Sequence, residues 1–220
     1  KLIIQIYKLA LLNKRNTIIF QNKDDKKRLM EISNLNKNNL KLIYGSGVNL
    51  SKFYPKNYEI DPPIVLFAGR LLISKGINDF IEAAKYLKDI RFVIAGEYDY
   101  ENPDCINPAY IKQISEKGIV EYWGYSERME EIINKCSIVI LPSYYGEGLP
   151  KILIEAAACG KPIITTDHPG CRDAIIEKKT GLLVPIKDPK AIANAIKDII
   201  NNKKRMMTMG KAARFFAEEN

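Results

Sequence analysis

Histidine and cysteine are scarce in this sequence, and their scarcity excludes several kinds of functional site. Among the 220 residues there is one histidine, His168, and the four cysteines, Cys105, Cys136, Cys159 and Cys171, include no Cys-x-x-Cys pair. Zinc sites are built from such ligands at close spacing, so the sequence contains no zinc-binding pattern. Cys136 and Cys159 stand in apolar contexts, and we interpret them as small core residues of a protein from a reducing compartment.

The sequence also lacks a hydrophobic run that is long enough to cross a membrane. Charged residues follow the apolar opening segment, residues 1–12, at once, whereas a membrane-spanning helix needs about 20 apolar residues. No small-residue cleavage site of a signal peptide follows it either. Because the chain starts with Lys1 rather than Met, we expect a piece of a larger cytoplasmic protein.

The sequence has no excess of acidic residues, and its excess of basic residues is confined to one part of the chain. The formal net charge is +8. Residues 1–52 carry all of this excess, because residues 53–220 hold equal numbers of basic and acidic residues. Since no basic stripe runs through the main part of the chain, nucleic acid is not expected as the main ligand. The basic segment suits peripheral contact with the anionic inner face of a membrane, and a Lys-rich solvated face explains it equally well.

Short runs rich in Val and Ile alternate with amphipathic stretches along the whole chain. Such runs are typical of strands in a parallel sheet that helices cover on both faces. The sequence therefore predicts an α/β fold with a doubly wound parallel sheet. The expected strands are residues 17–21, 40–45, 64–69, 91–96, 120–124, 137–143, 162–166 and 181–185. The expected helices lie near residues 77–88, 108–118, 126–135, 150–159, 188–202 and 203–218.

A proline-rich stretch divides the chain into two unequal parts. Residues 51–63 contain three prolines and no periodicity, so they are interpreted as a linker or hinge. They separate a short basic piece, residues 1–50, from a complete α/β domain, residues 64–218. Ligands of doubly wound sheets bind beyond the carboxyl ends of the strands. The loops of interest therefore follow residues 69, 96, 124, 143 and 166.

The first of these loops has the residues of an anion site. Gly69 ends a strand, Arg70 follows it, and Lys75 stands at the mouth of the next helix. Amide groups and the dipole at a helix N-terminus add to the two positive charges. Two fixed cations suit a diphosphate, although an Arg and a Lys in a loop are often only solvated surface.

A second loop, SYYGEGLPKILIE, combines an outward-facing backbone with two carboxylates. Pro150 is expected at the first helical position, which would leave the amides around Gly148 and Leu149 pointing outward. Glu147 stands just before the start of this helix and Glu155 stands inside it, at a distance of about 12 Å along the helix axis. Carboxylates accept hydrogen bonds from neutral diols, which sugars and ribose supply. Two exposed helix glutamates are the simpler interpretation of the same pair.

Three segments together resemble the family-four retaining glycosyltransferases, whose two Rossmann-like domains define the GT-B type. The segments are FAGRLLISKG, EGLPKILIEAAACGKPIITTDHPG and GLLVPIKDP, and the resemblance covers essentially all of residues 64–218. Residues 16–50 resemble the end of the first domain and the hinge of these enzymes. The segment TTDHPGCR is similar to the branch that makes bacterial capsule, lipopolysaccharide and lipid-linked oligosaccharide.

The resemblance implies that residues 64–218 are the nucleotide-sugar-binding half and residues 1–50 a remnant of the acceptor-binding domain. It implies that Arg70 and Lys75 stabilise the departing diphosphate and that Glu147 contacts the donor sugar. These three are the implied catalytic residues. The ribose would bind Glu155, and the base would lie beside Tyr125. The implied donor-binding set is Gly69, Arg70, Lys75, Gly124, Tyr125, Glu147, Gly148, Leu149, Pro150 and Glu155.

The resemblance also implies the partners. The expected donor is a nucleotide-diphosphate sugar, in particular a UDP-sugar, and the expected acceptor is a glycan or a lipid-linked sugar. The reaction would retain the anomeric configuration and would need neither a cofactor nor a metal. The rest of the first domain would come from a separate chain, or self-association would cover the exposed faces of residues 1–50.

Three other functions compete with this one, and one of them, a basic membrane- or nucleic-acid-associated domain, is indicated by residues 1–52 alone. A non-catalytic nucleotide-sugar-binding fragment of a split or degraded gene would keep the same donor residues, so the sequence does not distinguish it. A Rossmann dehydrogenase needs a Gly-x-Gly-x-x-Gly turn between a strand and a helix. The segment GSGVNL, residues 45–50, offers only Gly-x-Gly and precedes the linker, which argues against a dehydrogenase.

Overall fold

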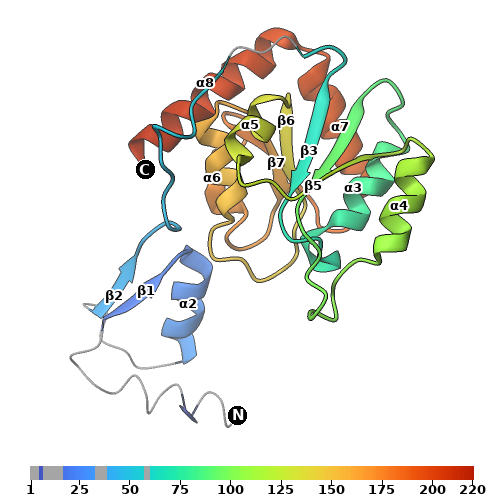
Figure 1. Cartoon of the computed structure of the whole chain (residues 1–220). Coiled ribbons are helices and arrows are strands. Elements are labelled where there is room, and N and C mark those ends of the chain that lie inside the picture. Colours follow the sequence, from blue (N-terminus) through green and yellow to red (C-terminus); the bar gives the residue numbers. More distant parts are fainter. Residues whose placement is uncertain (1–4, 7–16, 33–38, 57–59) are drawn as a thin grey trace.

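A computed structural model describes residues 5–6, 17–32, 39–56 and 60–220 (Figure 1). The expected α/β fold is confirmed, and each of the eight expected strands forms within its expected range. The strands are β1 (Ile18–Phe20), β2 (Leu40–Leu42), β3 (Ile64–Ala68), β4 (Arg91–Ala95), β5 (Glu121–Gly124), β6 (Ile138–Leu141), β7 (Ile163–Thr166) and β8 (Gly181–Val184).

The six expected helices also form in the described part of the chain, together with a further helix at Lys23–Ile32 and two short 3-10 turns that were not expected, Ile73–Lys75 and Arg172–Ala174. The helices are α2 (Lys23–Ile32), α3 (Ile77–Ala84), α4 (Pro108–Glu116), α5 (Met129–Asn134), α6 (Lys151–Ala158), α7 (Pro189–Ile200) and α8 (Lys203–Glu219). Asp24 and Asp25 lie in the first turn of α2, where negative charge favours the helix dipole.

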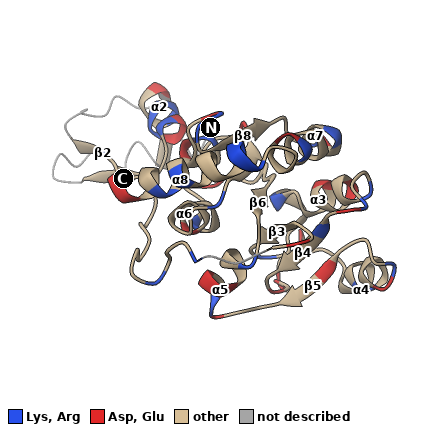
Figure 2. Ribbon diagram, turned by 90° about the horizontal axis from the view of Figure 1, so that it is seen from above, with Lys and Arg blue, Asp and Glu red and all other residues tan. Residues whose placement is uncertain are grey.

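The strands form two parallel sheets in the described part of the chain. The larger sheet has the order β5-β4-β3-β6-β7-β8, and the smaller one pairs β1 with β2. All five residues of β3 are buried, because β4 and β6 flank it and helices cover both faces. Figure 2 shows α3, α4 and α7 on one side of the larger sheet and α5, α6 and α8 on the other. This cover explains why the strands consist of unbroken apolar runs.

The chain changes direction in the sheet at β3. From β3 it proceeds through β4 to β5, then crosses back to β6 and continues through β7 to β8. Val65 in β3 is therefore paired with Phe92 on one side and with Ile138 on the other. The loops after β3 and β6 leave in opposite directions, and the crevice that this opens is where doubly wound sheets bind ligands.

The core contains the apolar residues that the pattern indicated. The rings of Phe67 and Phe80 lie 5.6 Å apart between centroids, and those of Phe80 and Phe92 lie 5.2 Å apart. The interpretation of Cys136 and Cys159 as core residues is confirmed, since both are buried free thiols. Burial raises the pKa of the Cys136 thiol to about 12, so this cysteine is an unreactive packing residue.

The segment interpreted as a linker is fastened to the larger domain. Phe53 is buried in its core. Arg214 of α8 donates from Nη1 to the carbonyl oxygens of Phe53 at 2.9 Å and of Ala158 at 2.7 Å. Asn134 at the end of α5 accepts from the Lys56 amide at 2.9 Å. Residues 51–56 thus form a strap that is bound to α8 and α5.

The first unit, β1-α2-β2, rests on one edge of the larger domain (Figure 1). Asp24 is 3.8 Å from the Arg172 guanidinium, and the Lys23 amide donates to Asp173 at 3.3 Å. The expected apolar exposure is confirmed for Ile19 but is wrong for Phe20, which is buried. Of residues 1–12, only Gln5 and Ile6 belong to the described part, and Ile6 is exposed.

Within the described residues, none of the helices is both long enough and apolar enough to span a bilayer.

Candidate functional site

The loops after β3 and β6 meet at the point where the sheet changes direction. Lys75 from the first loop and Glu147 from the second form an ion pair, with 2.9 Å between Nζ and Oε1. Their side chains are only 14% and 11% exposed. Ser143 donates from Oγ to the same carboxylate oxygen at 3.2 Å. Two residues that were predicted from separate loops are thus brought together, and Ser143 is an additional member that the sequence analysis missed.

A glycine fixes the position of Lys75. Gly76 has a φ of 78°, a left-handed conformation that side chains rarely adopt. A Cβ at this position would collide with the carbonyl oxygen of Pro142, directly after β6. The Tyr144 amide also donates to the Ser74 carbonyl at 2.9 Å. The backbone around Lys75 therefore lies against the β6 loop, which explains why Lys75 reaches Glu147.

Arg70, the other expected cation, is half-exposed and takes a different partner. Its Nη1 lies 2.8 Å from the carboxylate of Asp99, which stands in the loop after β4. Gly69 donates its amide to the carbonyl of Ala95 at 3.1 Å. Arg70 therefore lies at the outer side of the crevice, where Asp99 fixes it. Asp99 was not among the predicted site residues, because nothing in its local sequence marks it as a partner of Arg70.

A pocket of about 610 Å³ opens beside this crevice. It brings together Tyr125, which follows Gly124 at the end of β5, and Glu155 from α6. Tyr125 is exposed, whereas Glu155 is buried. Burial raises the pKa of Glu155, and the charge of Lys151 opposes this rise, from a distance of 3.6 Å between Nζ and Oε1. Lys52 of the strap lines the pocket as well.

One expectation about the second loop is wrong, and one alternative interpretation is excluded. Pro150 is the N-cap of α6 with ψ of 121°, and the helix begins at Lys151, because an N-cap residue keeps an extended ψ while the next residue starts the turn. The simpler interpretation of exposed helix glutamates also fails, since the Glu147 and Glu155 side chains are 11% and 9% exposed. Leu149 is half-buried, and Gly148 faces Gln21 of the first unit.

The first unit contributes a contact to this loop that the sequence analysis missed. Asn22, which lies between β1 and α2, is fully buried. Its Nδ2 donates to the carbonyl oxygens of Glu147 at 3.2 Å and of Gly148 at 3.3 Å. The pattern Asn22-x-x-Asp25 signals a helix N-cap, but no local pattern indicates which distant carbonyls the side chain would meet.

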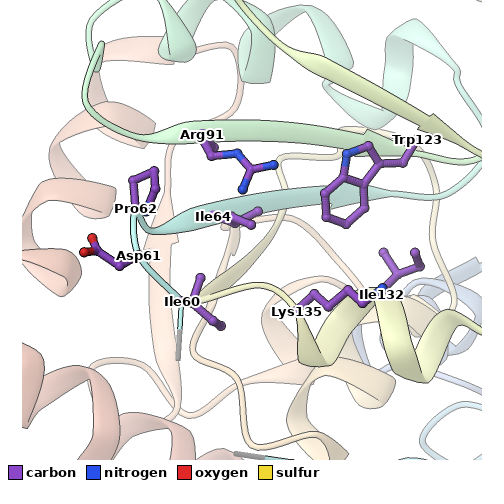
Figure 3. A pocket seen from close by; sticks show the side chains of 8 residues that line it. All are labelled: Ile60, Asp61, Pro62, Ile64, Arg91, Trp123, Ile132 and Lys135. Atoms are coloured by element: carbon purple, nitrogen blue, oxygen red, sulfur yellow. The ribbon is translucent and has the colours of Figure 1, made fainter. Parts of the chain in front are cut away.

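A second pocket, of about 500 Å³, lies away from these residues (Figure 3). Ile64 and Arg91, which begin β3 and β4, line it together with Trp123 and Lys135. The Arg91 guanidinium is already bound by Glu121, with 2.7 Å from Nε to Oε1. Ile64 and Arg91 place this pocket toward the amino ends of these strands, the opposite end from the crevice, so it takes no part in the candidate site.

Comparisons with known protein sequences identify relatives of this chain. The family model described as Glycosyl transferases group 1 matches residues 51–215. The chain is 34% identical over 222 residues to the N,N'-diacetylbacillosaminyl-diphospho-undecaprenol alpha-1,3-N-acetylgalactosaminyltransferase of Campylobacter jejuni. That match covers 94% of the chain and 57% of the relative. The chain spans about half the length of the curated relatives it matches.

Solved structures share the fold. Sucrose-phosphate synthase from Thermosynechococcus elongatus superposes with a TM-score of 0.86 at 28% identity, over 98% of this chain and 56% of that one. The C-terminal domain of a group 1 family glycosyl transferase from Francisella tularensis superposes with a TM-score of 0.67 at 22% identity. It covers 79% of this chain and 98% of that domain. The second likeness shows the fold alone.

Proposed function

The chain belongs to the group 1 glycosyl transferases, and from this premise we propose that it is the donor-binding half of a retaining enzyme that uses a UDP-sugar. The family consists of glycosyltransferases, and the six-stranded parallel sheet has the arrangement of their GT-B fold. The observation that carries the proposal is the largely buried Lys75–Glu147 pair, which lies at the ligand-binding edge of the sheet beside the pocket of Tyr125 and Glu155.

In this proposal Lys75 and Arg70 bind the donor diphosphate. Each cation is held by a carboxylate, Glu147 and Asp99 respectively, which keeps it in place before the donor arrives. When the bond between the sugar and the diphosphate breaks, negative charge develops on the leaving phosphate. Cations that are already fixed in position stabilise this charge. They supply the positive charge that a metal would otherwise bring, so no metal is proposed.

Glu147 is proposed to contact the sugar rather than the phosphate. A carboxylate repels a phosphate, but it accepts hydrogen bonds from sugar hydroxyls. Glu147 lies 2.9 Å from Lys75, so a sugar attached to the diphosphate that Lys75 holds would lie within reach of the carboxylate. The departing phosphate takes the proton of the acceptor hydroxyl as the new glycosidic bond forms on the same face. The anomeric configuration is thereby retained.

The nucleoside is proposed to occupy the pocket of about 610 Å³. Glu155 accepts hydrogen bonds from the two ribose hydroxyls, and its burial strengthens them because water does not compete. Tyr125 is exposed and flat, so the base can stack on its ring. The backbone that faces the donor at this edge of the sheet is proposed to come from Gly69, Gly124, Gly148, Leu149 and Pro150.

The acceptor is proposed to be a lipid-linked sugar in cell-surface polysaccharide synthesis, and the transferred sugar an N-acetylhexosamine. This follows the name of the Campylobacter relative, which is an N-acetylgalactosaminyltransferase acting on a diphospho-undecaprenol acceptor. Such an acceptor lies at a membrane, and the basic residues 1–52 suit contact with its anionic cytoplasmic face. Binding of the donor without transfer is the alternative function.

Calorimetry with UDP-N-acetylgalactosamine in EDTA tests the proposal, with GDP- and ADP-sugars as comparisons. We expect binding without metal. Lys75→Ala should weaken the UDP-sugar by about 1.5–3 kcal/mol, the contribution of a charged hydrogen bond, and should leave uridine unchanged. Lys85→Ala is the matched control, because Lys85 forms an exposed ion pair with Glu82. A strict need for magnesium, or equal loss of uridine binding in Lys75→Ala, would contradict the proposal.

A further inference from the structure

A buried asparagine of the first unit contacts the backbone of the donor-binding loop. Asn22 is fully buried and lies far in sequence from Glu147 and Gly148, whose carbonyl oxygens accept from its Nδ2 at 3.2 and 3.3 Å. Buried polar side chains are hydrogen-bonded as a rule. Here the partners include two successive carbonyls of the loop that holds Glu147, which lies outside the unit of Asn22.

Two hydrogen bonds with Asp25 fix the orientation of the Asn22 amide. The Asn22 oxygen accepts from the Asp25 backbone amide at 2.7 Å, as an N-cap does. Its Nδ2 donates to the Asp25 carboxylate at 2.8 Å. An amide nitrogen carries two hydrogens. Asp25 takes one of them, and the carbonyls of Glu147 and Gly148 share the other.

The direction of these two carbonyls decides where two amides point. In a trans peptide, the C=O of one residue and the N–H of the next point in opposite directions. Because the carbonyls of Glu147 and Gly148 face Asn22, the amides of Gly148 and Leu149 face away from it. Neither amide donates to another group within the described residues. Both are therefore available to an anion on the far side of the loop.

A glycine packs against the same two carbonyls from the β7 side. Gly170 has a φ of 80°, and a Cβ there would collide with the carbonyl oxygens of Glu147 and Gly148. The two peptide planes are thus enclosed by Asn22 and by the backbone at Gly170. Only Asn22 offers them a hydrogen-bond donor among the described residues.

We propose that Asn22 is a positioning residue for the donor, which aims the amides of Gly148 and Leu149 at the diphosphate by holding the two preceding carbonyls. This role rests on the proposed function. It makes the first unit part of the donor site without touching the donor, and it couples the acceptor side of the molecule to donor binding.

The substitution Asn22→Asp tests the role, because it keeps the size and the helix cap and replaces the donor by an acceptor. The introduced carboxylate would face two carbonyl oxygens and Asp25, so the loop should move away. At about pH 8 we expect the Kd for UDP-N-acetylgalactosamine to rise about tenfold or more, as for a lost buried hydrogen bond. The Kd for uridine should remain unchanged, since Tyr125 and Glu155 lie outside this contact.

The pH profile separates positioning from a general loss of stability. Burial and the nearby Asp25 raise the pKa of the introduced carboxyl. In its protonated form the carboxyl can donate to a loop carbonyl. The loss of UDP-sugar affinity relative to the wild-type chain should therefore shrink as the pH falls to about 5.5. A purely structural defect would leave this loss of affinity constant or enlarge it. UDP-sugar is the probe because its diphosphate has no proton to lose in this range.

Asn202→Asp is the matched control, because Asn202 caps α8 by accepting from Arg205 at 2.9 Å and should show no change in donor affinity. If Asn22→Asp does not fold, Asn22→Ser keeps a capping oxygen but does not reach the loop, and it should lose affinity equally at every pH. Equal loss of uridine and UDP-sugar binding, or unchanged UDP-sugar binding, overturns the positioning role. Failure of the wild-type chain to bind any nucleotide sugar overturns the proposed function and the positioning role with it.

Discussion

Two glutamates with little-exposed side chains stand at this site, and their surroundings differ. The Glu147 carboxylate lies 2.9 Å from Lys75 Nζ and accepts a hydrogen bond from the Ser143 hydroxyl at 3.2 Å. Glu155 has Lys151 at 3.6 Å, and that lysine is largely exposed. Burial therefore raises the pKa of Glu155. A carboxyl whose pKa is raised by folding destabilises the folded state whenever it is ionised, so Glu155 is retained at a cost to stability.

Glu155→Gln removes this charge and keeps the shape of the side chain. The destabilisation by Glu155 is present above its folded-state pKa and disappears below its unfolded value. We expect the variant to melt at a higher temperature than the wild-type chain at about pH 7, and the difference to vanish toward about pH 4. Uridine and UDP-sugar should both bind about tenfold more weakly. Melting curves across pH, together with calorimetry, measure the two effects.

Glu116→Gln is the control for this experiment, because Glu116 is exposed and forms a surface pair with Lys112 at 4.0 Å. It should change neither stability nor affinity. A Glu155→Gln variant that melts lower than the wild-type chain at about pH 7 would show that Glu155 contributes more through its hydrogen bonds than its burial costs.

Among the elements, α8 is held to the domain by one side chain in particular. Arg214 donates to the Phe53 carbonyl in the strap and to the Ala158 carbonyl at the end of α6. The second contact places a cation at a helix C-terminus, where the helix dipole favours it. Arg214 thereby joins three elements that are distant in the sequence.

Arg214→Ala should lower the free energy of unfolding by about 2 kcal/mol, since it leaves carbonyl groups without their charged donor. Urea denaturation monitored by circular dichroism measures this. Arg205→Ala on the same helix is the comparison. Arg205 pairs with Asp198 at a more exposed position, and such surface pairs contribute about 0–1 kcal/mol. Equal stability of the two variants would show that water satisfies the Phe53 and Ala158 carbonyls.

The elements could be predicted from the sequence because their signals are local. Apolar runs such as IVLFA in β3 and IVIL in β6 identify buried parallel strands without any knowledge of their neighbours. Pro150 was misplaced by one position because proline is tolerated both at the N-cap and at the first helical position. The 3-10 turn Ile73–Lys75 was missed because a single turn has no periodicity to detect.

The sequence predicted residues that lie together at this edge, but it did not predict which of them form pairs. Lys75, Glu147, Tyr125 and Glu155 were singled out from their loops, and the structure brings them to one edge. The contacts of Arg70 with Asp99 and of Asn22 with the Glu147 carbonyl depend on how distant loops pack. No local pattern of residues encodes that packing.

At the scale of the whole molecule, we expect this chain to bind a UDP-sugar without transferring it. Transfer requires an acceptor held against the donor, and the orientation of two substrates contributes roughly 7–11 kcal/mol to lowering a barrier. The first unit offers one helix and two short strands in the described part of the chain. Ile19 and Ile43 of this unit are exposed, and we expect a partner chain or a second copy to cover them.

An assay with UDP-N-acetylgalactosamine and a diphospho-undecaprenol-linked sugar measures this expectation. Binding should be observed without product, and product should appear only when the remaining part of a full-length relative is added as a separate chain. Turnover by the monomeric chain alone at about 1 per second or more, an ordinary enzyme rate, would contradict it. Binding that no added chain converts to turnover would favour the non-catalytic alternative.

The place of β3 between β4 and β6 also affects how the protein is made. On the ribosome β3, β4 and β5 emerge well before β6, so one side of β3 has no neighbour during that interval. Leu66 and Phe67, which later pair with Val139 and Ile140, then belong to an open edge strand of apolar character. Such edges recruit other chains. The same strand order that creates the ligand crevice thus leaves an apolar edge on the nascent chain open to pairing with other chains until β6 has been synthesised.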